Sequence, residues 1–169
     1  NRAHEEDDTL TAEILLENGS EEAIYGLLKR FTVKASNQVV DEEEKAQIYN
    51  MVVELQSDAI PAILRFIRHE AMLLHPLKAL TEIVDEPAVV GHLIEVLHQI
   101  GPDYIKTPER KLHLVQHLET CADSRISEAL LPFLDDHDET VRFQVIQALS
   151  ERRDEACSAA LFERLLTDE

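Results

Sequence analysis

Residues 124–149, SRISEALLPFLDDHDETVRFQVIQAL, decide the fold of this chain. Two apolar patterns with helical spacing run through this stretch, one containing Leu130 and Leu134 and the other containing Val141 and Val145. Residues three or four positions apart lie on the same face of a helix, so each pattern predicts an amphipathic helix. The acidic run between the two patterns is typical of a turn that caps the second helix. The stretch is therefore predicted to be a pair of helices.

The same pair of patterns recurs along the chain. The central apolar residues of the first helices are Leu27, Ile63, Leu93, Leu130 and Leu161, which lie 36, 30, 37 and 31 residues apart. Another apolar residue follows each of them four positions later, namely Phe31, Ile67, Leu97, Leu134 and Leu165. Helix pairs that repeat at this spacing indicate an α-solenoid, in which each pair buries its apolar face against its neighbours.

The predicted architecture is all-α: an α-α superhelix of about four helix pairs with a half-repeat at each end. We expect a single domain over residues 1–169, divided into units 9–19 (a half-repeat), 20–56, 58–84, 86–120, 124–151 and 153–167 (a half-repeat). Terminal repeats of a solenoid normally have a polar outer face. We therefore expect the protein to continue past one or both ends of this sequence.

Local signals set the expected helix boundaries. Helix caps are predicted at Ser20, Asp41, Glu86, Thr107 and Asp138, from capping residues that precede apolar patterns or a proline. Gly101 followed by proline ends one helix, and residues 32–40 form an irregular connection before Asp41. The two longest connections within pairs are therefore predicted at residues 32–40 and 101–106.

Composition excludes several classes of protein. Hydrophobic residues make up 44% of the chain, and only 4 glycines and 5% aromatic residues are present, which favours a folded helical protein over a disordered or all-β one. The formal net charge of −18 repels phosphate backbones, so no nucleic-acid partner is expected and a basic protein partner is favoured. No apolar run approaches the roughly 18 residues of a membrane span. The widely separated Cys121 and Cys157 fit packed thiols in a reducing compartment, which predicts a cytoplasmic location.

The stretch 124–149 resembles a HEAT repeat of bacterial HEAT-like proteins. The matching features are Leu130-Leu131-Pro132, Leu134, Asp135-Asp136, the run from Asp138 to Arg142, and Ala148-Leu149. The resemblance implies that an acid and a base at fixed positions form a structural ladder between neighbouring repeats. The residues at those positions here are Asp41 and Lys45, Thr107 and Lys111, and Asp138 and Arg142. The second repeat departs from the pattern, because Leu73 stands where the base is expected.

Candidate chemical groups have simpler structural interpretations. His113 and His117 have a metal-compatible spacing, but no glutamate follows His113 as in a zinc protease motif. HEAT-like deoxyhypusine hydroxylases bind iron through several His-Glu dipeptides in symmetric repeats, whereas this chain has two, at residues 4–5 and 69–70. The carboxylates of the turn, Asp135, Asp136, Asp138 and Glu139, fit helix capping better than a calcium loop. We therefore predict no catalytic residue, no metal site and no cofactor.

Two apolar features are candidates for binding. Apolar side chains occur in or beside the two long connections, and with a neighbouring lysine they form the predicted partner-binding set Val39, Val40, Tyr104, Ile105 and Lys106. Either they bind a partner at one edge of the solenoid or they fold back over the core. The second feature is a stripe in one register of the second helices, Ala46, Leu74, Leu112 and Phe143. Packing between repeats is the favoured interpretation of the stripe, and a groove for a partner helix is the alternative.

These observations predict a non-enzymatic module for protein–protein interaction or scaffolding. The alternative is a regulatory or lyase-like subunit that acts on a cofactor-bearing protein, because the HEAT fold also hosts bilin lyases. Metal-dependent hydroxylation is the third and weakest reading. A protein partner is expected, with neither nucleic acid nor membrane.

Overall fold

The computed structural model describes residues 20–34, 36–152, 158–159 and 162, and every regular element among them is helical. The all-α fold class predicted from the sequence is thus confirmed. The predicted half-repeat at 9–19 lies outside the described residues, as does nearly all of the one at 153–167. The chain divides into two compact units, Asn1–Val84 and Asp85–Glu169, which are described in turn as the first unit and the second unit.

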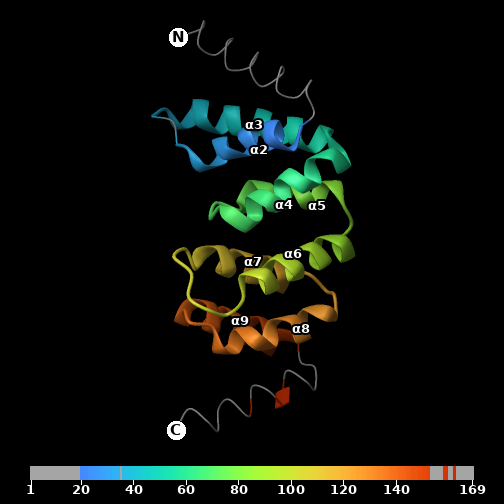
Figure 1. Ribbon diagram of the computed structural model, residues 1–169, viewed down its shortest axis with the longest axis vertical. Coiled ribbons are helices and arrows are strands. Elements are labelled where there is room, and N and C mark those ends of the chain that lie inside the picture. The colour runs from blue at the N-terminus through green and yellow to red at the C-terminus, as the bar shows by residue number, and fades with distance from the viewer. Residues whose placement is uncertain (1–19, 35, 153–157, 160–161, 163–169) are drawn as a thin grey trace, which may run out of the picture. The chain divides into compact units, whose positions relative to one another are not determined.

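The first unit contains two helix pairs that stack on each other (Figure 1). Its elements in order are α2 (Glu21–Leu28), the 3₁₀ turn η1 (Lys29–Thr32), α3 (Gln38–Glu54), the 3₁₀ turn η2 (Gln56–Ala59), α4 (Ile60–His69) and α5 (Leu74–Ile83). The first helices α2 and α4 pack together, and so do the second helices α3 and α5. This like-with-like contact is the packing that a helical repeat requires, because each pair buries its apolar face on the next.

The helix starts of the first unit agree with one sequence signal and correct another. Ser20 caps α2 as predicted, with its hydroxyl accepting from the backbone N–H of Ala23 at 3.2 Å. The expectation that Asp41 opens the next helix is wrong, because the side chain of Asn37 accepts from the N–H of Val39 at 3.1 Å and starts α3 at Gln38. Asparagine caps a helix as well as aspartate does, so the earlier residue sets the start.

Glu70 ties the end of α4 back to α2. Its carboxylate accepts from the Tyr25 hydroxyl at 3.1 Å and from the Lys29 ammonium at 2.5 Å. Burial tends to raise the pKa of Glu70, but these hydrogen bonds outweigh burial and leave the pKa below its usual value. The dipeptide at residues 69–70 therefore has a structural explanation in the contacts of its glutamate.

The second unit repeats the same arrangement with α6 (Glu86–Ile100), α7 (Glu109–Glu119), α8 (Arg125–Leu130), the 3₁₀ turn η3 (Leu131–Asp135) and α9 (Glu139–Arg152). Helix α6 packs on α8, and α7 packs on α9 (Figure 1). Its core is formed by residues that the repeat alignment placed on the inner faces, including Leu93, Leu97, Leu130, Val145 and Leu149.

Two helix starts of the second unit are displaced by one residue from their predicted positions. Helix α6 is capped by Asp85, whose carboxylate accepts from the N–H of Ala88 at 3.1 Å, and Glu86 is the first helical residue. Helix α7 begins at Glu109 with Pro108, not Thr107, in the cap position. Gly101 ends α6 as predicted, with a φ of 70° that a side chain would disfavour.

Candidate partner-binding pocket beside Tyr104

A buried ion pair fixes the connection between α6 and α7. The Lys111 ammonium donates to the Asp136 carboxylate at 2.7 Å and to the backbone carbonyl of Asp103 at 2.7 Å. The Lys111 side chain is 1% exposed and that of Asp136 is fully buried. Because both charges are removed from water, each depends on the other for compensation. Lys111 thus joins its own connection to the turn of the following repeat.

Further hydrogen bonds hold that turn, residues 135–138, in place. Asp136 uses its second carboxylate oxygen to accept from the N–H of Asp138 at 2.9 Å. Arg142 donates to the carbonyls of Asp136 at 2.8 Å and His137 at 3.1 Å. The N–H of His137 donates to the carbonyl of Pro102 at 2.9 Å, which links the turn directly to the connection after α6. Backbone groups that loops often leave to water are thus bonded within the protein here.

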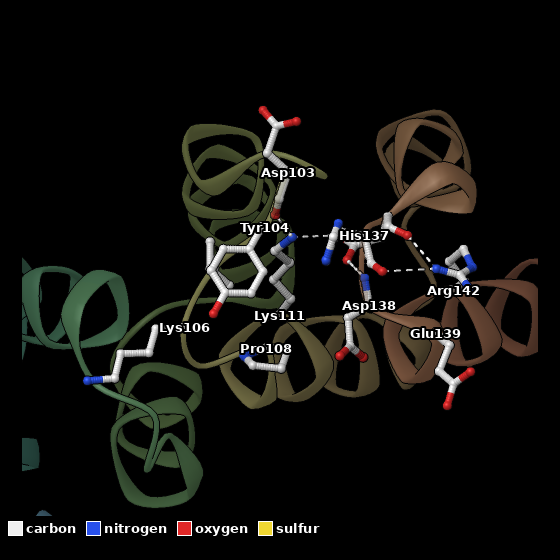
Figure 2. A pocket seen from close by; sticks show the side chains of 11 residues that line it. Asp103, Tyr104, Lys106, Pro108, Lys111, His137, Asp138, Glu139 and Arg142 are labelled. Atoms are coloured by element: carbon white, nitrogen blue, oxygen red, sulfur yellow. Dashed lines mark hydrogen bonds and ion pairs between the residues drawn. The ribbon is translucent and has the colours of Figure 1, made fainter.

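Tyr104 projects from this fixed connection. Its ring meets the His137 ring edge to face, with centroids 5.2 Å apart and planes at 84°, a favourable arrangement for aromatic rings. The tyrosine nevertheless remains 69% exposed. Figure 2 shows the ring beside the Lys111 side chain, with Pro108 below the ring and Asp138 to the right. The result is an aromatic side chain held by its neighbours and open to a partner.

A cavity of about 370 Å³ opens between the connection and the turn. This volume lies within the range of about 300–1,000 Å³ usual for ligand pockets. Tyr104, Ile105 and Lys106 line one side, and Asp138, Glu139 and Arg142 line another. We call it the Tyr104 pocket. It combines aromatic and aliphatic surface with charges of both signs, which is the composition of a polar protein-binding site.

Asp138 contributes a carboxylate to the Tyr104 pocket and also caps α9. It accepts from the N–H groups of Thr140 at 2.9 Å and Val141 at 3.2 Å, and from the Thr140 hydroxyl. The hydrogen bond from the Thr140 hydroxyl and those from the two backbone N–H groups hold the pKa of Asp138 below its usual value. The carboxylate is therefore ionised at neutral pH and gives this rim of the pocket a negative charge.

The hydrogen-bond partners of the proposed ladder residues differ from those that the sequence indicated. Lys111 pairs with Asp136 of the next repeat instead of Thr107, and Arg142 bonds backbone carbonyls. In the first unit Lys45 pairs with Asp41 of its own helix at 2.6 Å. Sequence reasoning treated Asp136 only as a turn residue. One signal in the sequence pointed to this pair. Thr107 is neutral, so Lys111 has no acidic partner at the ladder position of its own repeat and must find one elsewhere.

Three of the five predicted partner-binding residues line this pocket, namely Tyr104, Ile105 and Lys106. Val39 and Val40 belong to the first unit, where they lie in the first turn of α3 and not in a loop. Both valines are exposed, so they do not fold back over the core. Ile105 is half-buried and Lys106 is exposed.

The favoured interpretation of the stripe on the second helices is wrong. Packing between repeats would bury these side chains, yet Leu74 is 76% exposed and Phe143 is 68% exposed. Ala46 is exposed as well, and Leu112 is half-buried. The stripe therefore lies on the outer side of its helices, and the core is formed by the opposite side, where Ile48, Leu114 and Val145 are buried.

The described residues contain no group of three or more His, Cys, Asp or Glu side chains arranged to hold a metal ion. Burial lowers the pKa of His117, so this member of the His113 and His117 pair is neutral at pH 7. Among the described helices, none combines the length and the apolar character needed to cross a lipid bilayer.

Comparison with protein families supports the helical-repeat assignment. Residues 106–169 match the family model described as HEAT repeats. This segment includes α7, α8 and α9, and with them most of the residues of the Tyr104 pocket. Proteins of this family are typically non-enzymatic, and their repeats commonly serve as scaffolds for protein partners. The searches of curated proteins and of solved structures found no match to the chain.

Proposed function

We propose, from the match of residues 106–169 to the HEAT-repeat family and from the geometry above, that this chain binds another protein at the Tyr104 pocket and catalyses no reaction itself. The observation that carries the proposal is the combination of exposure and restraint at Tyr104. The ring is 69% exposed, while the connection that bears it is fixed by the buried pair of Lys111 and Asp136. A restrained aromatic residue loses little conformational entropy on binding, and tyrosine is enriched among the residues that dominate binding energy.

The partner is proposed to present a basic segment. The chain has a net charge of −18, and the carboxylates of Asp103, Asp138 and Glu139 line the Tyr104 pocket together with the bases Lys106 and Arg142. Complementary charge mainly accelerates association and selects among partners, and added salt screens it. A lysine or arginine near an apolar side chain of the partner would match both the carboxylates and the tyrosine ring. The proposed location is the bacterial cytoplasm.

The test is partner capture with the purified full chain as bait and mass spectrometry as readout. Tyr104→Ala is expected to lose a partner that the wild type retains, and Tyr104→Phe is expected to keep it because the ring remains. Met72→Ala, which removes another exposed apolar side chain in the first unit, is the matched control. An identical partner set for the wild type and Tyr104→Ala would disprove the role of the pocket.

A further inference from the structure

The outer side of the second helices in the second unit carries apolar side chains that no described element covers. We call the surface formed by Leu112 on α7 and by Phe143 and Ile146 on α9 the α7–α9 face. Phe143 is 68% exposed, Ile146 is 40% exposed and Leu112 is half-buried. Phe143 and Ile146 are three residues apart, so they lie on the same side of α9 one turn from each other. Leu112 holds the corresponding position in the preceding repeat.

The two helices form one continuous surface. Helices α7 and α9 pack against each other. Gln144, next to Phe143, donates to the Glu119 carboxylate at 2.6 Å and accepts from the Gln116 amide at 3.5 Å, so polar side chains join the helices beside the apolar residues. This exposure does not result from a poorly packed helix, because Val141 and Val145 are fully buried on the opposite side of α9. Helix α9 thus has two apolar sides, and the core uses one of them.

Among the described residues, the charges that border the α7–α9 face and are not engaged elsewhere are carboxylates. Helical spacing places Glu109 and Glu119 on the same side of α7 as Leu112, and Glu139 on the same side of α9 as Phe143. The arginines of α9 are engaged elsewhere. Arg142 donates to the carbonyls of the turn, and Arg152 donates to the carbonyls of Leu118, Cys121 and Asp123. An apolar strip bordered by carboxylates repels an acidic occupant and attracts a basic one.

We propose that the α7–α9 face binds an amphipathic helix of a partner protein, with apolar anchors on one side and lysine or arginine on the other. Apolar anchors that recur every three or four residues match the one-turn spacing of Phe143 and Ile146. The basic residues of such a helix would lie over Glu109, Glu119 and Glu139. The apolar residues of this face, Leu112, Phe143 and Ile146, lie outside the Tyr104 pocket, and only Glu139 borders both, so the proposal goes beyond the proposed function and does not depend on it.

The test uses a fluorescein-labelled synthetic helix of about 18 residues, with leucine at the positions of one face and lysine elsewhere. Binding to the full chain is measured by fluorescence anisotropy. The wild type is expected to bind this peptide, and Phe143→Ala is expected to weaken binding by about tenfold or more, as for loss of a central aromatic anchor. Ile146→Ala is expected to have a smaller effect in the same direction, and Met72→Ala is the matched control for loss of an exposed apolar side chain in the other unit.

Three further measurements distinguish binding of a basic partner helix from the alternatives. A peptide with glutamate in place of lysine is expected not to bind, and Glu109→Lys, which leaves the lining of the Tyr104 pocket unchanged, is expected to weaken binding of the lysine peptide. Failure of the wild type to bind, or equal binding by Phe143→Ala, would overturn the proposal. Sedimentation velocity identifies the remaining alternative, since a wild-type dimer that Phe143→Ala dissociates would make a second copy of the chain the occupant. Neither result bears on partner capture through Tyr104, so the two proposals fail separately.

Discussion

Lys45 in the first unit and Lys111 in the second occupy the same position of the repeat but make different contacts. Lys45 forms a pair with Asp41 one turn earlier in α3, and both side chains keep some exposure to water. Lys111 is buried and reaches Asp136 in the next repeat. The difference lies in the following connection, because the turn before α9 supplies a carboxylate, while α5 is preceded by Leu73. A shared sequence position therefore does not fix an interaction; the next repeat decides it.

The largest difference between the two lysines is expected on substitution. Lys111→Met leaves the Asp136 carboxylate buried without its cation, so the free energy of unfolding is expected to fall by about 3–5 kcal/mol, measured by urea denaturation. Combining Lys111→Met with Asp136→Leu removes both charges and is expected to restore much of this loss. A loss below about 1 kcal/mol for Lys111→Met would show that the pair is not buried as described.

Each unit also has one described residue with a positive φ, and the two differ in side chain. Gly101 has a φ of 70°, and Gln56, after α3, has a φ of 50°. A side chain in this region costs about 1–2 kcal/mol, so Gly101→Ala is expected to lower the free energy of unfolding by about that amount. Gln56→Gly relieves the backbone strain, which raises the free energy of unfolding. The greater freedom of the unfolded chain and the loss of the hydrogen bond from the Gln56 side chain to the Val53 carbonyl lower it. The net effect is expected to be a smaller loss of stability than for Gly101→Ala, or a gain. Thermal unfolding followed by circular dichroism measures both, and equal effects would contradict the assigned φ values.

The second helices α3 and α9 are capped by different residues, Asn37 and Asp138, and only the second cap titrates. The pKa of Asp138 is lowered in the folded state, so its contribution is present above the unfolded value of roughly 3.9 and is lost as pH falls through the folded value. Asp138→Ala is expected to cost about 1 kcal/mol at pH 7 and less in acid, whereas the cost of Asn37→Ala stays constant. Urea denaturation at several pH values tests this contrast, which a constant cost for Asp138→Ala would refute.

The smallest effect is expected at the local pair of the first unit. Lys45→Met removes a contact within one helix, worth about 0.3–0.5 kcal/mol. Added salt is expected to reduce this cost further, and the much larger cost of Lys111→Met is expected to change little with salt. A cost above about 2 kcal/mol for Lys45→Met would mean that Lys45, like Lys111, compensates a buried charge.

Much of the helix-pair architecture could be predicted because its signals are local and repeated. The spacing of apolar residues located the pairs, and Ser20, Gly101 and Asp138 marked helix ends correctly. The start of α3 was missed because Asn37 and Asp41 are both suitable caps, and only the structure shows which one bonds an N–H group. Proline before α7 likewise allowed two starts one residue apart.

The candidate site was predictable in part. Tyr104 and its neighbours were identified from the length of their connection and its apolar residues, a signal contained in the sequence itself. The partner of Lys111 could not be identified in this way, since any of several carboxylates in the turn could reach it. The burial of the stripe was predicted wrongly because α9 has two apolar sides, one with Phe143 and one with Val145. Periodicity alone does not tell which of two apolar sides of a helix packs against the core.

The buried contact between Lys111 and Asp136 bears on how such an array could be lengthened. Arg142 stands 31 residues after Lys111, at the equivalent place in the following repeat. A tandem duplicate of residues 122–152, which is 31 residues long, would place the copied Asp136 25 residues after Arg142, the separation that joins Lys111 to Asp136. Each added module would bring a carboxylate toward the base of its predecessor, and Arg142, which now donates to the carbonyls of Asp136 and His137, would gain an acidic partner from the copied turn.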